Sequence, residues 1–528
     1  MLIGPRALHY VVGILATTSV PSAAPEPPPN IVFILADDLG WKDLGCYGNT
    51  LVDTPHVDRL AREGTRFTDA YMCPTCSPSR SSLMTGAYPE RYQMSEHIDT
   101  HRRGWERLSP PLTGIALPTS AVSLADVLIP RGYRSSLMGK WHLGYGDTPY
   151  RLDSFEMPPG RGEKSMRCAF GFVEPPPLSA PGIGAAYDPR LKDFARDNPG
   201  KETGPLTLQA IRFIEQNRNR PFFCYLAYHA VHTVPEARKD LVTKYRLRFV
   251  AHQQETSPVY AAMTEAMDEG VGLVLEALHT LHLSERTVVI FASDNGGLQT
   301  EYNGIGPIMT ENFPLHGQKA NLWEGGIRVP YIVRWPGHIV PGSEHRDPII
   351  SNDLMPTLAE IAGAALPANY PGDGVSLVPL ITGRVASLAD RPLFWHTPTY
   401  MHISSSPGSA VREGPYKLIE FLEDNHVELY DLANDISESH DLAVAQPDRA
   451  TRMRELLHRW RDQVHAEMPK PNPNFDPQKA YYWTVRPKHT WEPAALDKIK
   501  LPTWNELKTA DALYDEGVTP STKTSPER

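Results

Sequence analysis

The sequence predicts an α/β fold, in which a large mixed, mainly parallel sheet is sandwiched by helices and a small C-terminal α+β domain contains an antiparallel sheet. Short apolar runs typical of buried strands alternate with helical patterns over most of the chain, and this alternation favours a mainly parallel sheet. The chain has 528 residues, too many for one ordinary core. Its 51 prolines indicate many fixed loops rather than a helical bundle.

Four apolar runs predict strands of the large sheet, and polar residues follow each of them directly. The runs span residues 31–36, 133–138, 222–228 and 287–292. Apolar residues recur at helical spacing over residues 206–214 and 263–278. Because ligands bind beyond the carboxyl ends of the strands in such sheets, we expect the four polar segments to form the functional site.

The pattern changes after residue 395. Residues 416–422 and 427–432 predict neighbouring antiparallel strands, and apolar residues between 453 and 464 predict one amphipathic helix. Residues beyond 481 show no clear period. We therefore expect a main domain over residues 25–395, a C-terminal subdomain over 396–480 and an extended tail over 481–528.

The N-terminus has the pattern of a signal peptide. Arg6 supplies positive charge, residues 11–20 are apolar, and the small residues 22–24 follow. The apolar run is shorter than the roughly 20 residues that span a bilayer. We expect residues 1–24 to direct export, to the periplasm or the exterior, and we expect no membrane span. A strand of the core is the alternative interpretation.

Charge and cysteine content exclude two classes of protein. The formal net charge is −10, which argues against general nucleic-acid binding because phosphate neutralisation needs a basic surface. The chain has five cysteines, an odd and low number for its length, so it is not a disulfide scaffold.

The segment C-S-P-S-R-S-S-L-M-T-G at residues 76–86 carries the strongest chemical pattern. Pro78 suits the first turn of a helix, which places Cys76 just before the helix N-terminus, where the dipole favours an anion. Arg80, one turn further on, could reach Cys76 or a bound oxyanion. The residues alone predict an activated cysteine that faces an anion site.

Cys73 and Cys76 also form a C-x-x-C pair, for which a redox role and a structural zinc site are alternatives. A redox role leaves Arg80 and the acidic segments without a function, and a lone C-x-x-C is weak support for it. A zinc site would need two more thiol or imidazole ligands at short spacing, and none is apparent.

Oxygen ligands follow two of the predicted strands. They are Asp37, Asp38, Asp294 and Asn295. Hard oxygen donors favour Ca²⁺ or Mg²⁺ over Zn²⁺, although a single Asp in such a place is more often a helix cap or turn former. Two long loop-like segments, residues 90–118 and 145–204, are expected to rim the site; the first contains Arg91, His97, His101, Arg102 and Arg103.

At residues 76–86 the chain resembles the sulfatase family, specifically its arylsulfatase A-like group within the alkaline phosphatase superfamily, whose pattern is C-x-P-S-R…T-G. Other landmarks of that family are found at residues 37–40 (D-D-L-G), 139–144 (G-K-W-H-L-G), 293–297 (S-D-N-G-G) and 324–330 (E-G-G-I-R-V-P), with His232 and Lys319 between them. The resemblance covers roughly residues 30–475.

The resemblance implies an alkaline-phosphatase-like fold and a sulfuric ester hydrolase that acts on a sulfated carbohydrate or another sulfate ester. It implies formylglycine at Cys76, made by a maturation enzyme, and one Ca²⁺ held by Asp37, Asp38, Cys76, Asp294 and Asn295. Lys140 would bind the nucleophile and sulfate oxygens, and His142 would be the base that expels sulfate. His232, the general acid, and Lys319 would contact the substrate sulfate, with Arg80 adding positive charge. His229 is expected to be structural.

Two other functions stay open at this point. A phosphonate monoester hydrolase or phosphatase of the same superfamily can share formylglycine, although the histidine-rich two-metal site of zinc-type alkaline phosphatases is not evident. A non-catalytic glycan-binding relative would be expected to lack Cys76 or part of the oxygen-ligand set, and the sequence retains all of them.

Overall fold

The computed structural model describes most of the chain between residues 27 and 477. The described ranges are 27–97, 104, 106–111, 114, 116–144, 170–177, 190–233, 235–254, 256–299, 308–401 and 405–477. The predicted signal peptide and the predicted tail lie outside these ranges. Among the described helices, none is both long and apolar enough to cross a bilayer.

Four parallel strands form the centre of the large sheet. Their order is β7 (Thr287–Ser293), β1 (Asn30–Ala36), β6 (Phe222–Ala227) and β4 (Arg134–Gly139). Each pairs in parallel with its neighbour, so their carboxyl ends meet at one edge. These are the four apolar runs from which the sequence predicted strands, and that prediction is confirmed.

Further strands extend the sheet on both sides. β5 (Phe172–Val173) continues it in parallel beyond β4, whereas β8 (Arg328–Arg334) is antiparallel to both β7 and β2 (Thr65–Tyr71). The short strands β9 (Ser343–His345) and β10 (Ile349–Ile350) pair in parallel with β2. Within the described residues the sheet has nine strands and is mixed but mainly parallel, as predicted.

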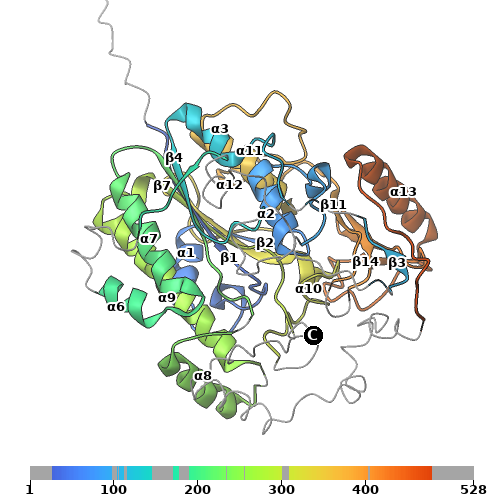
Figure 1. Cartoon of the computed structure of the whole chain (residues 1–528), viewed down its shortest axis with the longest axis horizontal. Coiled ribbons are helices and arrows are strands. Elements are labelled where there is room, and N and C mark those ends of the chain that lie inside the picture. Colours follow the sequence, from blue (N-terminus) through green and yellow to red (C-terminus); the bar gives the residue numbers. More distant parts are fainter. Residues whose placement is uncertain are drawn as a thin grey trace, which may run out of the picture.

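Side chains of β1 alternate between two hydrophobic cores, one on each face of the sheet: Phe33 lies in the first and Ile34 in the second. The helices that contribute to the first core are α2 (Cys76–Thr85), α3 (Leu124–Leu128), α11 (Leu354–Ala362) and α12 (Val378–Ile381). Those that contribute to the second are α1 (Pro55–Glu63), α7 (Thr203–Gln216) and α9 (Pro258–Thr280), with Leu191 added from α6 (Arg190–Asp197). Figure 1 shows these two layers around the sheet. The predicted helices at 206–214 and 263–278 are α7 and α9, and are confirmed.

Further helices lie around these layers. They are α6 (Arg190–Asp197), α8 (Lys239–His252), which packs on α9, and α10 (Glu324–Ile327), which leads into β8. α10 begins at the E-G-G-I motif that the sequence analysis singled out.

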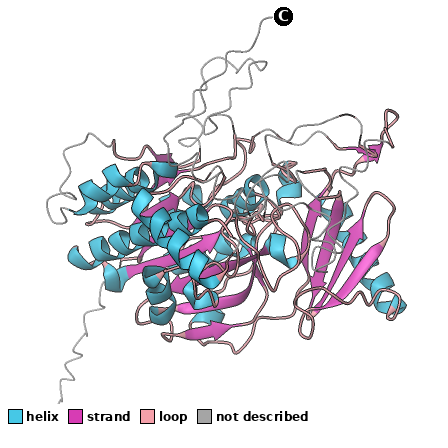
Figure 2. Cartoon of the chain, turned by 90° about the horizontal axis from the view of Figure 1, so that it is seen from below, coloured by secondary structure: helices cyan, strands magenta, loops and turns pink. Residues whose placement is uncertain are grey.

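A second, antiparallel sheet forms the C-terminal unit, visible on the right of Figure 2. Its strands run in the order β11 (Leu393–Thr397), β12 (Gly408–Glu413), β13 (Tyr416–Phe421) and β14 (Val427–Asp431), and α13 (Pro447–Val464) packs on them. The predicted antiparallel pair and helix are therefore confirmed. β3 (Leu108–Ser109) and β15 (Lys470–Pro471) form a separate two-stranded ribbon. β11, the first strand of this sheet, begins at Leu393, before the predicted domain division at residue 396. The domain bounds themselves remain predictions.

Aromatic side chains join the two sheets. The Trp395 indole donates to the Met72 carbonyl oxygen at 2.9 Å, and its ring lies 5.3 Å from that of Tyr71. Both rings are buried in the core that also contains Trp460 of α13. The segment after β2, which leads into α2, is therefore packed against the C-terminal unit.

Candidate active site

The polar segments after β7, β1, β6 and β4 meet at one edge of the large sheet. Asp294 follows β7, Asp37 follows β1, His232 follows β6, and Lys140 follows β4. Since these strands are parallel neighbours, the sheet itself brings the four segments together. Cys76 comes to the same edge from α2.

The oxygen ligands predicted from the sequence lie side by side and are buried. The Asp38 backbone N–H donates to Asp294 Oδ1 at 3.2 Å, and Asn295 Nδ2 donates to Asp38 Oδ1 at 2.8 Å. Asp38 has a φ of 63°, in the left-handed region that Asp tolerates better than most residues. That turn directs the chain away from the end of β1 while the carboxylate stays in the cluster.

Two oxygens of this cluster, Asp37 Oδ1 and Asn295 Oδ1, are buried and accept no hydrogen bond from any described residue. Burial, together with the charge of Asp37, raises the pKa of Asp294 well above its ordinary value despite the nearby Arg80. Buried acceptors without donors and repelling carboxylates both suit a hard cation. The donor set therefore fits Ca²⁺ or Mg²⁺.

The side chain at position 76 adjoins this cluster. Ligand atoms of Asp37, Asp38, Cys76 and His232 all lie within 4.8 Å of one another. This agrees with the expected grouping of Cys76 with the aspartates, and it adds the imidazole of His232.

Arg80 has partners other than Cys76. The sequence suggested that Arg80 could reach Cys76 or a bound oxyanion; in the structure Arg80 Nε and Nη2 donate to Asp294 Oδ2 at 3.0 and 2.8 Å, and Nη1 donates to the Lys140 carbonyl oxygen at 2.6 Å. The guanidinium is buried, and a buried charge needs such partners. Arg80 therefore ties α2 to the ends of β7 and β4.

Cys76 is the first residue of α2, and Thr75 is the N-cap; the expectation that Cys76 precedes the helix was wrong by one position. Burial would raise the pKa of the thiol, but the ammonium groups of Lys140 and Lys319 and a hydrogen bond with His142 hold that pKa well below its ordinary value. An anion is therefore favoured at this position.

Cationic side chains line the same cluster. Lys140 Nζ lies 2.7 Å from Asp37 Oδ2, and Lys319 Nζ lies 2.8 Å from Asp38 Oδ2. His232 Nε2 is 3.6 Å from Asp38 Oδ2, and burial together with Lys319 lowers its pKa. Aspartates and lysines pair directly in this arrangement.

Close backbone packing positions Lys319. A Cβ atom on Gly296 would lie 1.8 Å from the Gly325 carbonyl oxygen, so only glycine fits where these two segments touch. The Lys319 N–H donates to the Gly297 carbonyl oxygen at 3.1 Å. The glycine pairs of S-D-N-G-G and E-G-G-I thus allow the chain around Lys319 to approach the end of β7.

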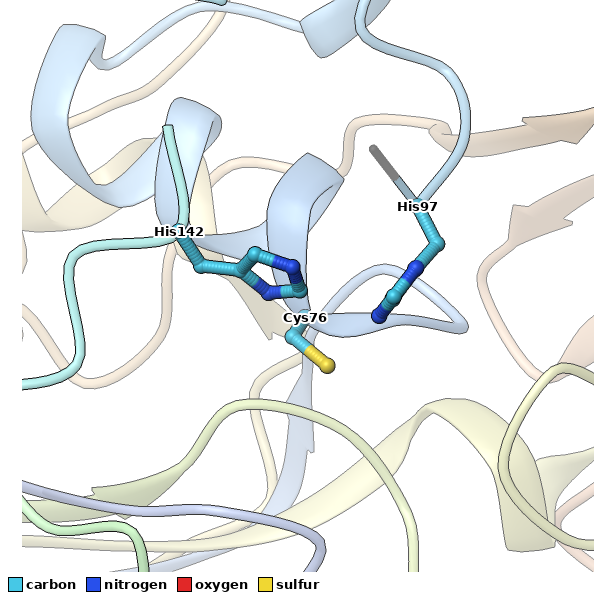
Figure 3. Close-up of side chains that lie close together, drawn as sticks. All are labelled: Cys76, His97 and His142. Atoms are coloured by element: carbon cyan, nitrogen blue, oxygen red, sulfur yellow. The ribbon is translucent and has the colours of Figure 1, made fainter. Parts of the chain in front are cut away.

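His142 and His97 converge on Cys76 from opposite sides (Figure 3). Their ring centroids are 4.5 Å apart at 78°, and a nitrogen of each ring lies within 4.8 Å of Cys76 Sγ and of the other. His142 was predicted as a site residue, whereas His97 was expected only in a loop at the rim. The sequence has no local signal for its position beside Cys76.

Other residues singled out in the sequence have different partners. Arg91 forms a bidentate ion pair with Asp373, at 2.7 Å for both contacts. His229 Nε2 is 3.7 Å from Glu202 Oε2, and burial lowers the pKa of His229 to about 4. His101, Arg102 and Arg103 lie outside the described residues. Cys73 and Cys76 form no disulfide.

Known families and proteins match most of this chain. The family model described as Sulfatase matches residues 29–364, and the model described as N-sulphoglucosamine sulphohydrolase, C-terminal, matches residues 316–466. Steryl-sulfatase of Mus musculus is 34% identical over 470 residues, covering 76% of this chain and 73% of that protein. Arylsulfatase A of Homo sapiens is 34% identical over 412 residues, covering 74% of each.

Similar solved structures cover nearly the whole chain. The crystal structure of Ps i-CgsB in complex with k-i-k-neocarrahexaose has a TM-score of 0.63 and 27% identity, and covers 90% of this chain and 100% of that one. The phosphonate monoester hydrolase of Agrobacterium radiobacter has a TM-score of 0.57 at 19% identity, covering 84% and 97%. The second likeness shows a shared fold only.

Proposed function

We propose, since the chain belongs to the sulfatase family and is a sulfuric ester hydrolase, that it removes sulfate from a carbohydrate with a formylglycine at position 76 and one bound Ca²⁺. The observation that carries this proposal is the position of Cys76 at the start of α2. There it faces two lysines, three histidines and the cluster of buried oxygen ligands.

Calcium would be held by Asp37, Asp38, Asp294, Asn295 and the side chain at position 76. Two oxygens that accept no hydrogen bond from the described residues, on Asp37 and Asn295, support this assignment. The bound ion would supply positive charge to the nucleophile and to the sulfate, the kind of electrostatic contribution that dominates many enzymes.

Formylglycine would be made from Cys76 by a separate maturation enzyme. Its hydrated form supplies two hydroxyl groups, one to attack sulfur and one whose proton loss allows sulfate to leave. A serine in its place would remain a stable sulfate ester.

The surrounding side chains have complementary roles. His142 hydrogen-bonds the side chain at position 76 and is placed to take a proton from it. Lys140 and Lys319 would bind sulfate oxygens, and His232 would protonate the leaving oxygen of the substrate. Arg80 holds Asp294 and the Lys140 segment in place through the contacts described above.

The substrate proposal has support from relatives. Ps i-CgsB was solved with a neocarrahexaose, and this chain matches it over 90% of its length. Residues 1–24 are proposed to direct export, which would bring the enzyme to sulfated polysaccharides outside the cell.

The test uses protein from a host that makes formylglycine. Peptide mass spectrometry should find the aldehyde at position 76, and the protein should hydrolyse an aryl sulfate faster than the matched aryl phosphate. Cys76→Ala should fold but lose nearly all turnover. A panel of defined sulfated oligosaccharides would then identify the sugar. Full activity with only a thiol at position 76, or a preference for phosphate, would contradict the proposal.

A further inference from the structure

His97 is a second imidazole beside the reactive position. It comes from the segment after the 3₁₀ helix Pro89–Tyr92, far from the strand ends that supply the other site residues. Its side chain is half-buried, and a ring nitrogen lies within 4.8 Å of Cys76 Sγ. Figure 3 shows the two rings close together, both directed toward Cys76 below them.

His97 also contacts the proposed base. The rings of His97 and His142 meet edge to face, with centroids 4.5 Å apart. The two nitrogens that approach Cys76 are within 4.8 Å of each other, so both imidazoles lie close to the same atom, Cys76 Sγ. His142 itself has a φ of 54°, an uncommon backbone conformation, so contacts such as this one help to fix its ring.

None of the roles assigned above uses this side chain. His232 lies 3.6 Å from Asp38 and belongs to the group that Cys76 forms with Asp37 and Asp38. The Cys76, His97 and His142 group shares only Cys76 with that set. The side chain at position 76 therefore stands between an acidic cation site and a pair of imidazoles.

We propose that His97 is a positioning residue that hydrogen-bonds the side chain at position 76 and fixes the ring of His142 against it. Its contribution to turnover rests on the proposed function. A hydroxyl at position 76 would be held between two imidazoles, oriented by His97 while His142 takes its proton. Precise orientation of a reacting group and its base is a large part of enzymatic rate acceleration.

The first experiment measures steady-state kinetics of formylglycine-containing variants on an aryl sulfate. His97→Ala should lower kcat about 10- to 100-fold, the usual loss when a partner of a metal-ligating side chain is removed, with KM nearly unchanged. His97→Asn or His97→Gln should recover part of kcat, because their amides can still donate a hydrogen bond. Ser95→Ala, a buried change on the same segment, should have little effect.

A rise in KM with unchanged kcat would make His97 a substrate-binding residue and would overturn the proposal. An equal loss of kcat in His97→Ala and Ser95→Ala would show that the segment matters only for folding. That result would also overturn the proposal.

The second experiment does not depend on sulfatase activity. Protein made without maturation keeps the Cys76 thiol, and one thiolate with two imidazoles is a good ligand set for Co²⁺ or Zn²⁺. Titration with Co²⁺ should give a thiolate-to-cobalt absorption band. His97→Ala should weaken Co²⁺ binding at least about tenfold, since even losing a partner of a metal ligand costs about 10- to 100-fold.

His232→Ala is the matched control, because His232 belongs to the other group around Cys76. It should leave Co²⁺ binding nearly unchanged. The reverse pattern, with His232 required and His97 dispensable, would place the ion among Asp37 and Asp38 and contradict the geometry proposed for His97. If the enzyme proved not to be a sulfatase, this titration would still decide whether His97 contacts the side chain at position 76.

Discussion

Two clusters of buried charge in this protein differ in how completely they are paired. At the junction of the two sheets, Lys417 Nζ donates to Glu324 Oε1 and Glu438 Oε1, both at 2.9 Å. Glu324 Oε2 accepts from Tyr71 and Arg328, and Glu438 Oε2 accepts from the Glu324 N–H. All four carboxylate oxygens are satisfied, so this junction cluster is closed.

The active-site cluster is open by comparison. Lys140 pairs with one oxygen of Asp37 and Lys319 with both oxygens of Asp38, but Asp37 Oδ1 and Asn295 Oδ1 have no donor among the described residues. Leaving buried acceptors unpaired costs about 1–3 kcal/mol each. A closed cluster fixes how two units pack, whereas an open one keeps acceptors available for a cation. The predictions below test that difference.

Asp37→Asn should have the largest effect. An amide can present its oxygen either to Lys140 or to a cation, but not to both, so this change should weaken Ca²⁺ binding. Activity on an aryl sulfate should fall at least about 100-fold, and added Ca²⁺ should restore part of it. Elemental analysis and a chelator titration measure the metal, and thermal unfolding monitors the fold. Wild-type enzyme that stayed fully active when metal-free would refute the open-cluster interpretation.

Lys417→Met should affect stability instead. Removing the ammonium leaves two buried carboxylates without their shared partner, and breaking a buried pair typically costs about 3–5 kcal/mol. Denaturant unfolding measures this loss, while kcat of the folded fraction should change far less than in Asp37→Asn. The double variant with Glu438→Gln should recover part of the lost stability. An unfolding free energy equal to that of the wild type would show that the closed cluster contributes nothing.

The sequence could predict the open cluster better than the closed one. Apolar runs predicted β1, β4, β6 and β7 because strands buried on both faces need continuous hydrophobic sequence. Parallel pairing then placed the residues after them at one edge, which located Asp37, Lys140 and Asp294 without any knowledge of side-chain contacts.

Contacts that depend on packing between distant segments could not be predicted. Lys417 lies in a strand with an ordinary polar–apolar pattern, and its partners Glu324 and Glu438 are 93 and 21 residues away. Arg80 reaches Asp294 across 214 residues, and His97 reaches Cys76 from a loop without periodicity. In these cases tertiary packing, rather than local pattern, decides which charges are buried together.

The smallest expected effect is a pH dependence of stability that separates the two glutamates of the closed cluster. Burial, with a contribution from the charge of Glu324, raises the pKa of Glu438 to about 8, although Lys417 opposes this shift; the pKa of Glu324 is instead lowered, chiefly by Lys417 against the effect of burial. Below the ordinary glutamate pKa the stabilisation from protonated Glu438 is fully present, and it is lost as pH rises through about 8.

The folded protein therefore binds more protons than the unfolded chain between about pH 4.5 and 8, and Glu438 should lower the free energy of unfolding by at most about 1.4 kcal/mol per pH unit there. Glu438→Gln should remove this downward slope when urea unfolding is measured at half-unit pH intervals. The amide can also change the free energy of unfolding by a constant amount at every pH, which does not affect the slope. Glu324→Gln should keep the slope over a narrower pH range, because burial still raises the pKa of Glu438 but the charge of Glu324 no longer contributes. The same slope in wild type and Glu438→Gln would mean that Glu438 is already ionised in the closed cluster, with Lys417 shared between two charged carboxylates.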